Sequence, residues 1–364
     1  MRSSDLRVRL LAVIGATTVA SLGMAACGSE GTSSSQAGDA ADEQHADAAR
    51  DDGPGNRFDH DASLPEASAT DAAGDEVSMS VRRPFLVGSS MRSARSEARD
   101  DWSASLPEDA AGDASLSAVT KRELARVWLA DALEEHASVA AFARFTMLML
   151  SVGAPPDLVV ASQRASLDEV NHARDCFALA QRYGAIAVGP GALDVHDSIG
   201  PMSLADLAAL TAEEGCVGET LGAALAAEQL ALVTDPAVRR VLSRIAKDEA
   251  RHAELSWRFV AWAVAEERRG SLGAAGVLAA VTTAVNHAVR ATRAMEIRPC
   301  MAPLADWHGH GRVTCAEARE AGERAIVDLV LPCLEALGAG SASNLLQNAV
   351  ATPMCMLTAS FLPE

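Results

Sequence analysis

The sequence predicts an all-α protein, whose folded part is a bundle of four long helices arranged as two antiparallel hairpins joined by a long crossover, with additional C-terminal helices. Two observations predict this fold. From about residue 117 onward, Ala, Leu and Val dominate, and no alternating strand pattern of useful length occurs. Gly and Pro are confined to a few points, which divide the region into segments of helix length.

The first two predicted helices form one hairpin. The first helix runs from about residue 119 to 150 and ends at Gly153-Ala-Pro-Pro. The second runs from about residue 156 to 183 and ends at Gly184. Because the connection is so short, the two helices must be antiparallel neighbours.

A stretch rich in Gly and Pro, residues 184–201, separates this hairpin from the next and is long enough to cross the bundle. The third helix begins after Ser203, a typical N-cap residue, and runs to about residue 233. Thr234-Asp-Pro makes the turn, and the fourth helix runs to about residue 269. This connectivity is typical of ferritin-like bundles.

A fifth helix, from about residue 271 to 297, completes a predicted bundle domain of residues 117–297. The helix is apolar near its start but contains Asn286, His287 and Arg290. We therefore expect it to pack against the bundle and not to span a membrane.

Residues 1–26 are predicted to be a lipoprotein signal peptide. Three arginines precede an apolar run over residues 10–26. The run ends in Met24-Ala-Ala-Cys27, and small residues directly before a cysteine resemble the lipobox of bacterial lipoproteins. Cys27 is the predicted lipidation site. An ordinary cleaved signal or a short membrane anchor is the alternative interpretation.

By this prediction the protein is exported and held at the cell envelope by the lipid on Cys27. Gly28-Ser29 follows the cysteine with no Asp beside it, which favours the outer membrane. Residues 27–116 are rich in Ala, Asp, Ser and Gly and have few large apolar side chains, so they are predicted to form a disordered tether. The net charge of -18 and the lack of Lys/Arg clusters argue against nucleic acid as a partner.

Residues 298–364 are predicted to be a helical extension that contains cysteines. If Cys27 carries lipid, six of the seven cysteines remain, and four of these follow residue 299. In an oxidising compartment an even number favours disulfides in the extension, although spacing leaves their connectivity open. No CxxC pair occurs, which excludes a rubredoxin-type iron site and a thioredoxin-like motif.

One motif, DExxHA, occurs twice, at Asp168-Glu-Val-Asn-His-Ala and at Asp248-Glu-Ala-Arg-His-Ala. Each copy lies in the second helix of a predicted hairpin. Residues i and i+3 share a helix face, so each motif points a carboxylate and an imidazole the same way. This is the ligand geometry of di-iron and di-manganese carboxylate bundles.

Each motif also needs a glutamate at the same height on the preceding antiparallel helix. Reflecting the first motif through its turn leads to Glu135, and reflecting the second leads to Glu219. The predicted metal-binding set is Glu135, Glu169, His172, Glu219, Glu249 and His252.

Several nearby residues compete for these roles. Glu134, His136 and Glu214 all lie close to the reflected positions, and Glu214 also falls on an apolar stripe. Asp168 and Asp248 either support the ligands or face solvent. The simplest alternative is that all these groups lie on charged helix surfaces. Charge balance favours the metal site, because four buried carboxylates repel one another and two divalent ions would neutralise them.

The region from about residue 122 to 265, under half of the chain, resembles the ferritin-like superfamily, near rubrerythrin and bacterioferritin in its ligand pattern of E, ExxH, E, ExxH. The resemblance implies that Glu169 and Glu249 bridge two metal ions. Glu135 and Glu219 would be terminal ligands, while the two histidines would bind one metal each. Iron, or manganese, suits such mixed ligation.

Sites of this kind react with O2 or peroxide, so the resemblance implies oxidase, peroxidase, ferroxidase or hydroxylase chemistry. Tyr183, the one tyrosine, lies about 16 Å along the helix from His172, which argues against a tyrosyl-radical function. A chain without CxxC pairs would need an external electron donor. The lipid anchor and tether fit a monomer or dimer better than a closed cage.

Two features leave alternatives open. The glycines of the third helix, Gly215, Gly218 and Gly222, either leave room for a small substrate or let helices pack closely. The function is either that of an oxidoreductase or that of a non-catalytic metal-binding or interaction module of the envelope.

Overall fold

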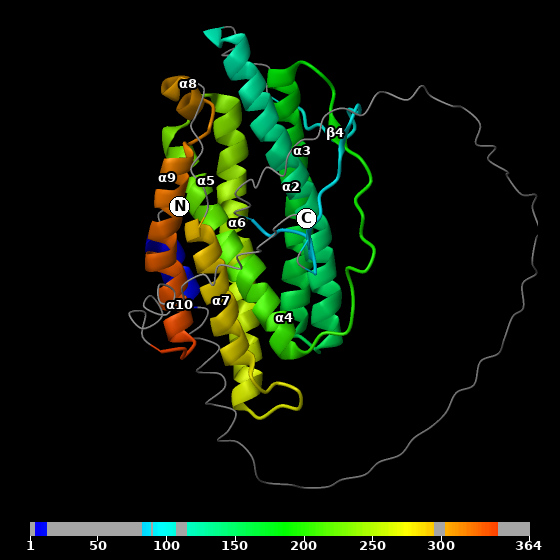
Figure 1. The fold of residues 1–364 in the computed structure, drawn as a ribbon, viewed down its shortest axis with the longest axis vertical. Coiled ribbons are helices and arrows are strands. Elements are labelled where there is room, and N and C mark those ends of the chain that lie inside the picture. The colour runs from blue at the N-terminus through cyan, green and yellow to red at the C-terminus, as the bar shows by residue number, and fades with distance from the viewer. Residues whose placement is uncertain (1–3, 13–81, 89, 107–114, 295–302, 341–364) are drawn as a thin grey trace, which may run out of the picture.

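The computed structural model describes residues 4–12, 82–88, 90–106, 115–294 and 303–340. These residues form a mostly helical bundle, in which long helices run side by side along the longest axis of the molecule (Figure 1). The all-α fold class and its two antiparallel hairpins are confirmed.

The first hairpin consists of α2 (Ala118–Ser151) and α3 (Pro156–Gly184). The Ser117 hydroxyl caps α2 by accepting a hydrogen bond of 3.0 Å from the Thr120 backbone N–H. The chain then turns through Gly153, whose φ of +71° favours glycine. Proline stands at the start of α3, where no backbone donor is needed.

The second hairpin begins after a crossover that runs along the bundle from the end of α3 to the start of α4 (Figure 1). Its first arm is α4 (Leu204–Thr211), a π-helical segment η2 (Ala212–Glu219) and α5 (Thr220–Leu232). Its second arm is α6 (Pro236–Arg268), which Asp235 caps. The extent of the third predicted helix is therefore right, but its π-helical segment was not predicted.

The centre of the bundle is filled by large aromatic and aliphatic side chains. The α3 and α6 helices, which carry the repeated motif, contact each other across this core. Its fully buried rings are those of Trp128, Phe142, Phe177, Trp257 and Phe259. Such a core keeps water away from any polar group that lies between the four helices.

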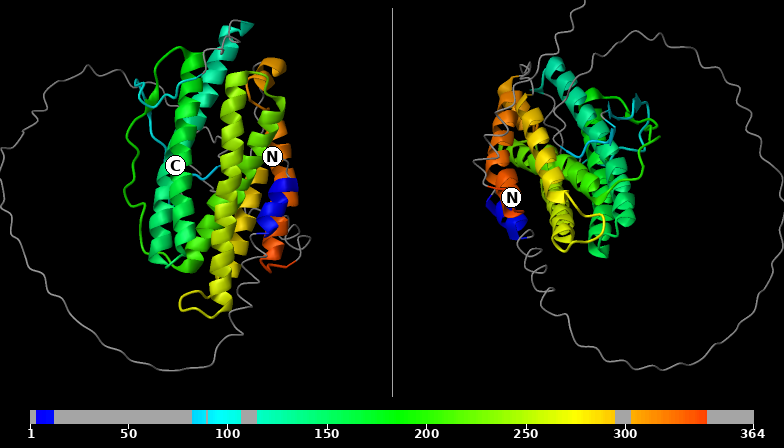
Figure 2. Two further views of the ribbon diagram at one scale, coloured as in Figure 1. Left: turned by 180° about the vertical axis from the view of Figure 1, so that it is seen from behind. Right: turned by 60° about the horizontal axis from the view of Figure 1, so that its bottom comes forward.

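The C-terminal part adds a layer beside the second hairpin, on the side away from α2 and α3 (Figures 1 and 2). It consists of α7 (Val277–Ala294), α8 (Leu304–Gly309), α9 (Cys315–Ala325), η3 (Ile326–Val330) and α10 (Leu331–Ala336). The α7 helix packs on α4 and η2, as predicted for the fifth helix. Within the described residues, no helix combines the length and apolarity needed to cross a membrane.

Four of the cysteines fall in the described part of the chain. Cys176, Cys216, Cys315 and Cys333 are free thiols there. Cys300 and Cys355, on which the predicted disulfides of the extension also depend, lie outside the described residues.

The end of the predicted tether is folded at residues 82–88 and 90–106, which corrects the prediction of disorder for these residues. The segment forms short strands, β1 (Leu86–Val87) with β2 (Ser90–Met91), and β3 (Ser96–Glu97) with β4 (Gly189–Pro190) of the crossover. Arg83 and Phe85 are each only 1% exposed. The segment offsets the entropy cost of its ordering by burying one aromatic ring and by pairing arginines with buried carboxylates. The prediction of disorder rested on the scarcity of apolar residues, which does not reveal such contacts.

The first described segment, residues 4–12, is helical and belongs to the predicted signal peptide. Leu6 and Leu10 are buried against the helical body, and Arg9 forms an ion pair with Glu254. Cys27 and residues 28–81 of the predicted tether lie outside the described residues.

Candidate metal centre

The structure brings all six predicted side chains together between the helices of the two hairpins. They form two overlapping groups, in each of which one potential ligand atom per residue lies within 4.8 Å of the others. One group is Glu135, Glu169, His172 and Glu249, and the other is Glu169, Glu219, Glu249 and His252. Glu169 and Glu249 belong to both groups.

Helix geometry explains why these residues meet. In each motif the glutamate and the histidine are one turn apart on the same helix face. Glu135 on α2 and Glu219 at the end of η2 lie at the matching height on the neighbouring antiparallel helices. All six residues are at most 1% exposed. The site is therefore a dry interior cluster, not a charged surface, and the surface interpretation is wrong.

Most buried polar atoms of the cluster make no hydrogen bond within the described structure, although arginines and imidazoles approach them at ion-pair distances. Both carboxylate oxygens of Glu135, Glu219 and Glu249 accept no hydrogen bond, and neither does Glu169 Oε2. The Nδ1 atoms of His172 and His252 are also without a hydrogen bond. Orphaned carboxylate oxygens and imidazole nitrogens that converge are the donor set a pair of divalent cations needs.

The surroundings of the four carboxyls shift their pKa values in opposite directions. Burial raises the pKa of Glu135 to about 8 and raises the pKa of Glu219 well above its ordinary value. Burial acts in the same direction on Glu169 and Glu249, but the two imidazoles, whose Nδ1 atoms lie 3.0–3.8 Å from their carboxylates, prevail and lower the pKa of both. In the metal-free cluster the pKa is thus raised for the two outer carboxyls, Glu135 and Glu219, and lowered for the central pair, Glu169 and Glu249.

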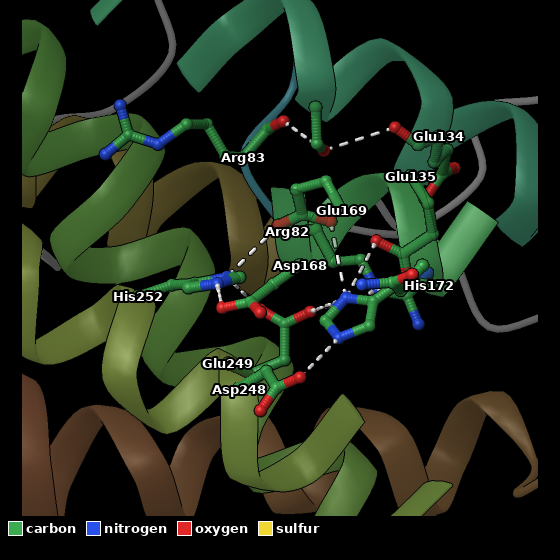
Figure 3. A network of polar contacts seen from close by, with 12 residues as sticks. Arg82, Arg83, Glu134, Glu135, Asp168, Glu169, His172, Asp248, Glu249 and His252 are labelled. Atoms are coloured by element: carbon green, nitrogen blue, oxygen red, sulfur yellow. Dashed lines mark hydrogen bonds and ion pairs between the residues drawn. The ribbon is translucent and has the colours of Figure 1, made fainter. Parts of the chain in front are cut away.

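Each histidine is oriented by an aspartate from the opposite motif. His172 Nε2 lies 3.1 Å from Asp248 Oδ2, and His252 Nε2 lies 3.4 Å from Asp168 Oδ2 (Figure 3). Arg251 contacts both aspartates, at 2.8 Å from Asp168 and 2.6 Å from Asp248. A histidine that donates from Nε2 to a carboxylate keeps its Nδ1 lone pair for a metal. Sequence reasoning left the role of the two aspartates open.

The competing residues lie elsewhere. Glu214 is buried, but its carboxylate is 2.8 Å from the Arg144 guanidinium and belongs to neither group. The His136 ring packs edge-on against Trp102, with centroids 4.9 Å apart. Glu134 also belongs to neither group. Glu135 and Glu219, and not these competitors, lie in the two groups, and their role as metal ligands stays a prediction.

Sequence reasoning missed two arginines. Arg82 Nε lies 3.2 Å from Glu135 Oε1 and 3.8 Å from Glu249 Oε1 (Figure 3). Arg83 Nε lies 3.5 Å from Glu219 Oε1. The signal in the sequence is a pair of adjacent arginines followed by Pro84 and Phe85, in a region that otherwise looks like a solvated linker.

The glycines of η2 make room for these arginines. A Cβ atom built on Gly215 would lie 2.3 Å from Arg83 Nη2, and one built on Gly218 would lie 2.7 Å from the Arg82 carbonyl oxygen. Of the two predicted uses of this glycine face, close helix packing describes Gly215 as well, because the same Cβ would lie 2.8 Å from the Ser256 Cβ of α6. Gly215 and Gly218 let the chain at residues 82–83 approach the bundle closely.

Comparisons with known proteins add little to this description. No family model matches the chain, and no curated protein matches it. Among solved structures, the chain is similar to "Protein 19 with aldehyde deformylating oxidase activity from Synechococcus", with a TM-score of 0.44 and 18% sequence identity over 64% of this chain and 100% of that chain. A likeness at that level assigns neither family nor activity.

Proposed function

We propose that this protein binds a dinuclear metal centre, with iron as the preferred metal. The centre would carry out oxidoreductase chemistry with O2 or peroxide, which includes ferroxidase activity. The observation that carries the proposal is the orphaned donor set of four carboxylates and two imidazoles inside a dry bundle. Mixed carboxylate and imidazole ligation suits Fe²⁺, and Mn²⁺ fits the same donors.

The residues have distinct roles in this proposal. Glu169 and Glu249, shared by the two groups, would bridge the ions. One ion would also be held by Glu135 and His172, and the other by Glu219 and His252. Bound Fe²⁺ would supply the electrons for reduction of O2 or peroxide, and an external donor would restore them.

The protein's own part is to hold the donors in place and to exclude water. Asp248 and Asp168 fix the two imidazole rings through Nε2, at 3.1 Å and 3.4 Å. Asp131, which Arg312 contacts at 2.6 Å, lies 4.0 Å from Arg82 at the edge of the cluster. The surrounding Phe142 ring packs edge-on against His252. A rigid, buried cluster keeps its geometry through changes in metal charge.

One observation favours the alternative of a non-catalytic metal-binding module. Arg82 and Arg83 fill the space beside Gly215 and Gly218 of η2, which the sequence suggested as room for a small substrate. The same assay separates the two functions, because only an oxidoreductase consumes an oxidant faster than its metal alone.

The test is consumption of O2 and of H2O2 by the reduced, iron-loaded protein, compared with an equal concentration of free Fe²⁺. A rate well above that of free Fe²⁺, abolished in a Glu169→Ala, Glu249→Ala variant, supports the proposal. Retention of the wild-type rate in an exposed-site control, Glu320→Ala, Glu335→Ala, shows that the loss is local. A metal-loaded protein no faster than free Fe²⁺ supports the non-catalytic module.

We also propose that the protein is exported and tethered to the cell envelope by lipid on Cys27, with the outer membrane favoured, as a monomer or dimer. The support is the lipobox-like sequence before Cys27 and the polar segment after it. Expression in a bacterial host with a palmitate analogue should label the wild type. A Cys27→Ser variant that is labelled equally would overturn the proposal.

A further inference from the structure

Residues 82–87, here called the arginine strap, lie against the bundle beside the six-residue cluster. The strap is held along α2 by two hydrogen bonds. The Ser138 hydroxyl donates a hydrogen bond of 2.8 Å to the Arg83 carbonyl, and the Arg144 guanidinium donates one to the Leu86 carbonyl. The Phe85 ring is buried against Ala137 and Ala141 of α2. The strap is thus an integral part of the folded site.

The two arginines of the strap divide the two outer carboxylates between them. The Arg82 guanidinium is 3.2 Å from Glu135, and the Arg83 guanidinium is 3.5 Å from Glu219. Neither contact reaches Glu169, the central carboxylate that both histidines contact. The arginines therefore meet the cluster at its outer carboxylates, although Arg82 also approaches Glu249 at 3.8 Å.

Both guanidinium groups are shielded from water. The Arg82 side chain is 11% exposed and the Arg83 side chain is 1% exposed. Arg83 also donates 3.0 Å to the Ser256 hydroxyl, and its guanidinium lies 4.6 Å from the Phe142 ring centroid and 4.5 Å from that of Phe145. Charges in such surroundings interact far more strongly than charges in water.

Charge balance follows from this placement. Four glutamates would carry four negative charges when ionised, and two divalent cations alone would cancel them. The strap already supplies two positive charges at the same carboxylates. Metal ions entering the cluster would meet guanidinium groups of like charge within a few ångströms, which lowers their affinity.

We infer that the arginine strap is a built-in competitor for the metal: Arg82 and Arg83 pair with Glu135 and Glu219 in the metal-free protein, and these pairs weaken when metal binds. The inference rests on the proposed dinuclear site. Its consequence is that the strap keeps the empty site stable and tunes how tightly metal is held.

The test compares Mn²⁺ binding and metal-free stability in the full chain. Free Mn²⁺ is measured by electron paramagnetic resonance during titration of the wild type, Arg82→Gln, Arg82→Lys and Arg83→Gln. We expect Arg82→Gln to bind Mn²⁺ about tenfold tighter or more, and to melt at a lower temperature without metal. Arg82→Lys retains the charge and should stay within about threefold of the wild-type Kd.

Arg92→Gln is the matched control. It also removes one arginine of the same segment, but Arg92 pairs with the exposed Asp194, 3.2 Å away. If the wild type binds two equivalents of Mn²⁺ and Arg82→Gln binds Mn²⁺ no more tightly than the wild type, the inference that the strap competes with metal is wrong. Binding of no Mn²⁺ by the wild type overturns the dinuclear site itself, and the strap inference with it. The two failures are thus distinguishable.

Discussion

His172 on α3 is paired with Asp248 on α6, and the two groups meet at 3.1 Å across the interface between the two hairpins. Asp248 directly precedes Glu249 of its own motif, yet it serves the histidine of the other motif. The second copy repeats the exchange, with Asp168 3.4 Å from His252. Each DExxHA motif therefore needs the other in order to be complete.

This exchange predicts the effect of removing one aspartate. Asp248→Asn retains the size of the side chain but weakens the hydrogen bond that orients His172. We expect metal affinity to fall about 10- to 100-fold, as is typical for groups that orient a metal-bound histidine. Competition with a chelating dye measures the affinity. Asp157→Asn, which alters an exposed aspartate on the same helix as His172, should change nothing. An equal effect of both variants would contradict the orienting role.

Metal should stabilise the fold, because the buried carboxylates repel one another in the empty protein. At a free Mn²⁺ concentration about 100 times Kd, binding contributes about 2.7 kcal/mol, which corresponds to a rise of about 5–10 °C in Tm. Thermal melts of the wild type with and without Mn²⁺ measure the rise. The idea fails if a Glu169→Ala, Glu249→Ala variant gains as much from Mn²⁺ as the wild type.

The stability of the metal-free protein should fall as the pH rises from about 5 to 8. The pKa of Glu135 is about 8 in the folded protein against an ordinary 4.5, so the native state keeps a proton that the unfolded chain releases. Burial gives Glu219 the same sign by raising its pKa. Each such group contributes a slope of up to about 1.4 kcal/mol per pH unit.

The other members of the cluster do not cancel this trend. Although burial opposes it, hydrogen bonds to Asp248 and Asp168 raise the pKa of His172 and His252, so their contribution is complete below about pH 6.5 and is lost at higher pH. Because the pKa of Glu169 is lowered from its ordinary 4.5, this group changes the stability only below about pH 4.5. Urea unfolding across this range measures the slope. A stability that rises with pH, or a slope unchanged in Glu135→Gln, would contradict these assignments.

Much of the bundle could be predicted from the sequence because its signals are local. Gly153 and Gly184 mark the ends of helices, and the i, i+3 spacing of Glu169 and His172 fixes a shared face. Reflection through a short turn then placed Glu135 at the right height. These steps need only helix periodicity and loop length, which a single sequence displays.

The strap and the π-helical segment could not be predicted in this way. Arg82 lies more than 50 residues before Glu135 in the chain, and no periodicity links a linker residue to a helix face. The π-helix at Ala212–Glu219 has no distinctive amino-acid composition, since Gly215 and Gly218 would be equally expected in an α-helix that packs closely on a neighbour. Both features arise from tertiary contacts between distant segments.

Close contact between the strap and η2 predicts a steric effect at Gly218. A Cβ there would lie 2.7 Å from the backbone oxygen of Arg82, which cannot rotate away as a side chain would. We expect Gly218→Ala to lower the free energy of unfolding by about 1–3 kcal/mol. Urea denaturation of the metal-free protein measures the change. Gly200→Ala is the control, because nothing lies within 4 Å of its Cβ. Equal stabilities of the two variants would refute the close approach.

Metal content tests the central claim most directly. The full-length protein is loaded with Fe²⁺ under anaerobic conditions, desalted and submitted to elemental analysis beside the Glu169→Ala, Glu249→Ala variant. We predict about two iron ions per chain in the wild type and nearly none in the variant, while Glu320→Ala, Glu335→Ala retains the wild-type content. A wild type that retains no iron, or a Glu169→Ala, Glu249→Ala variant that retains as much, would contradict the dinuclear centre.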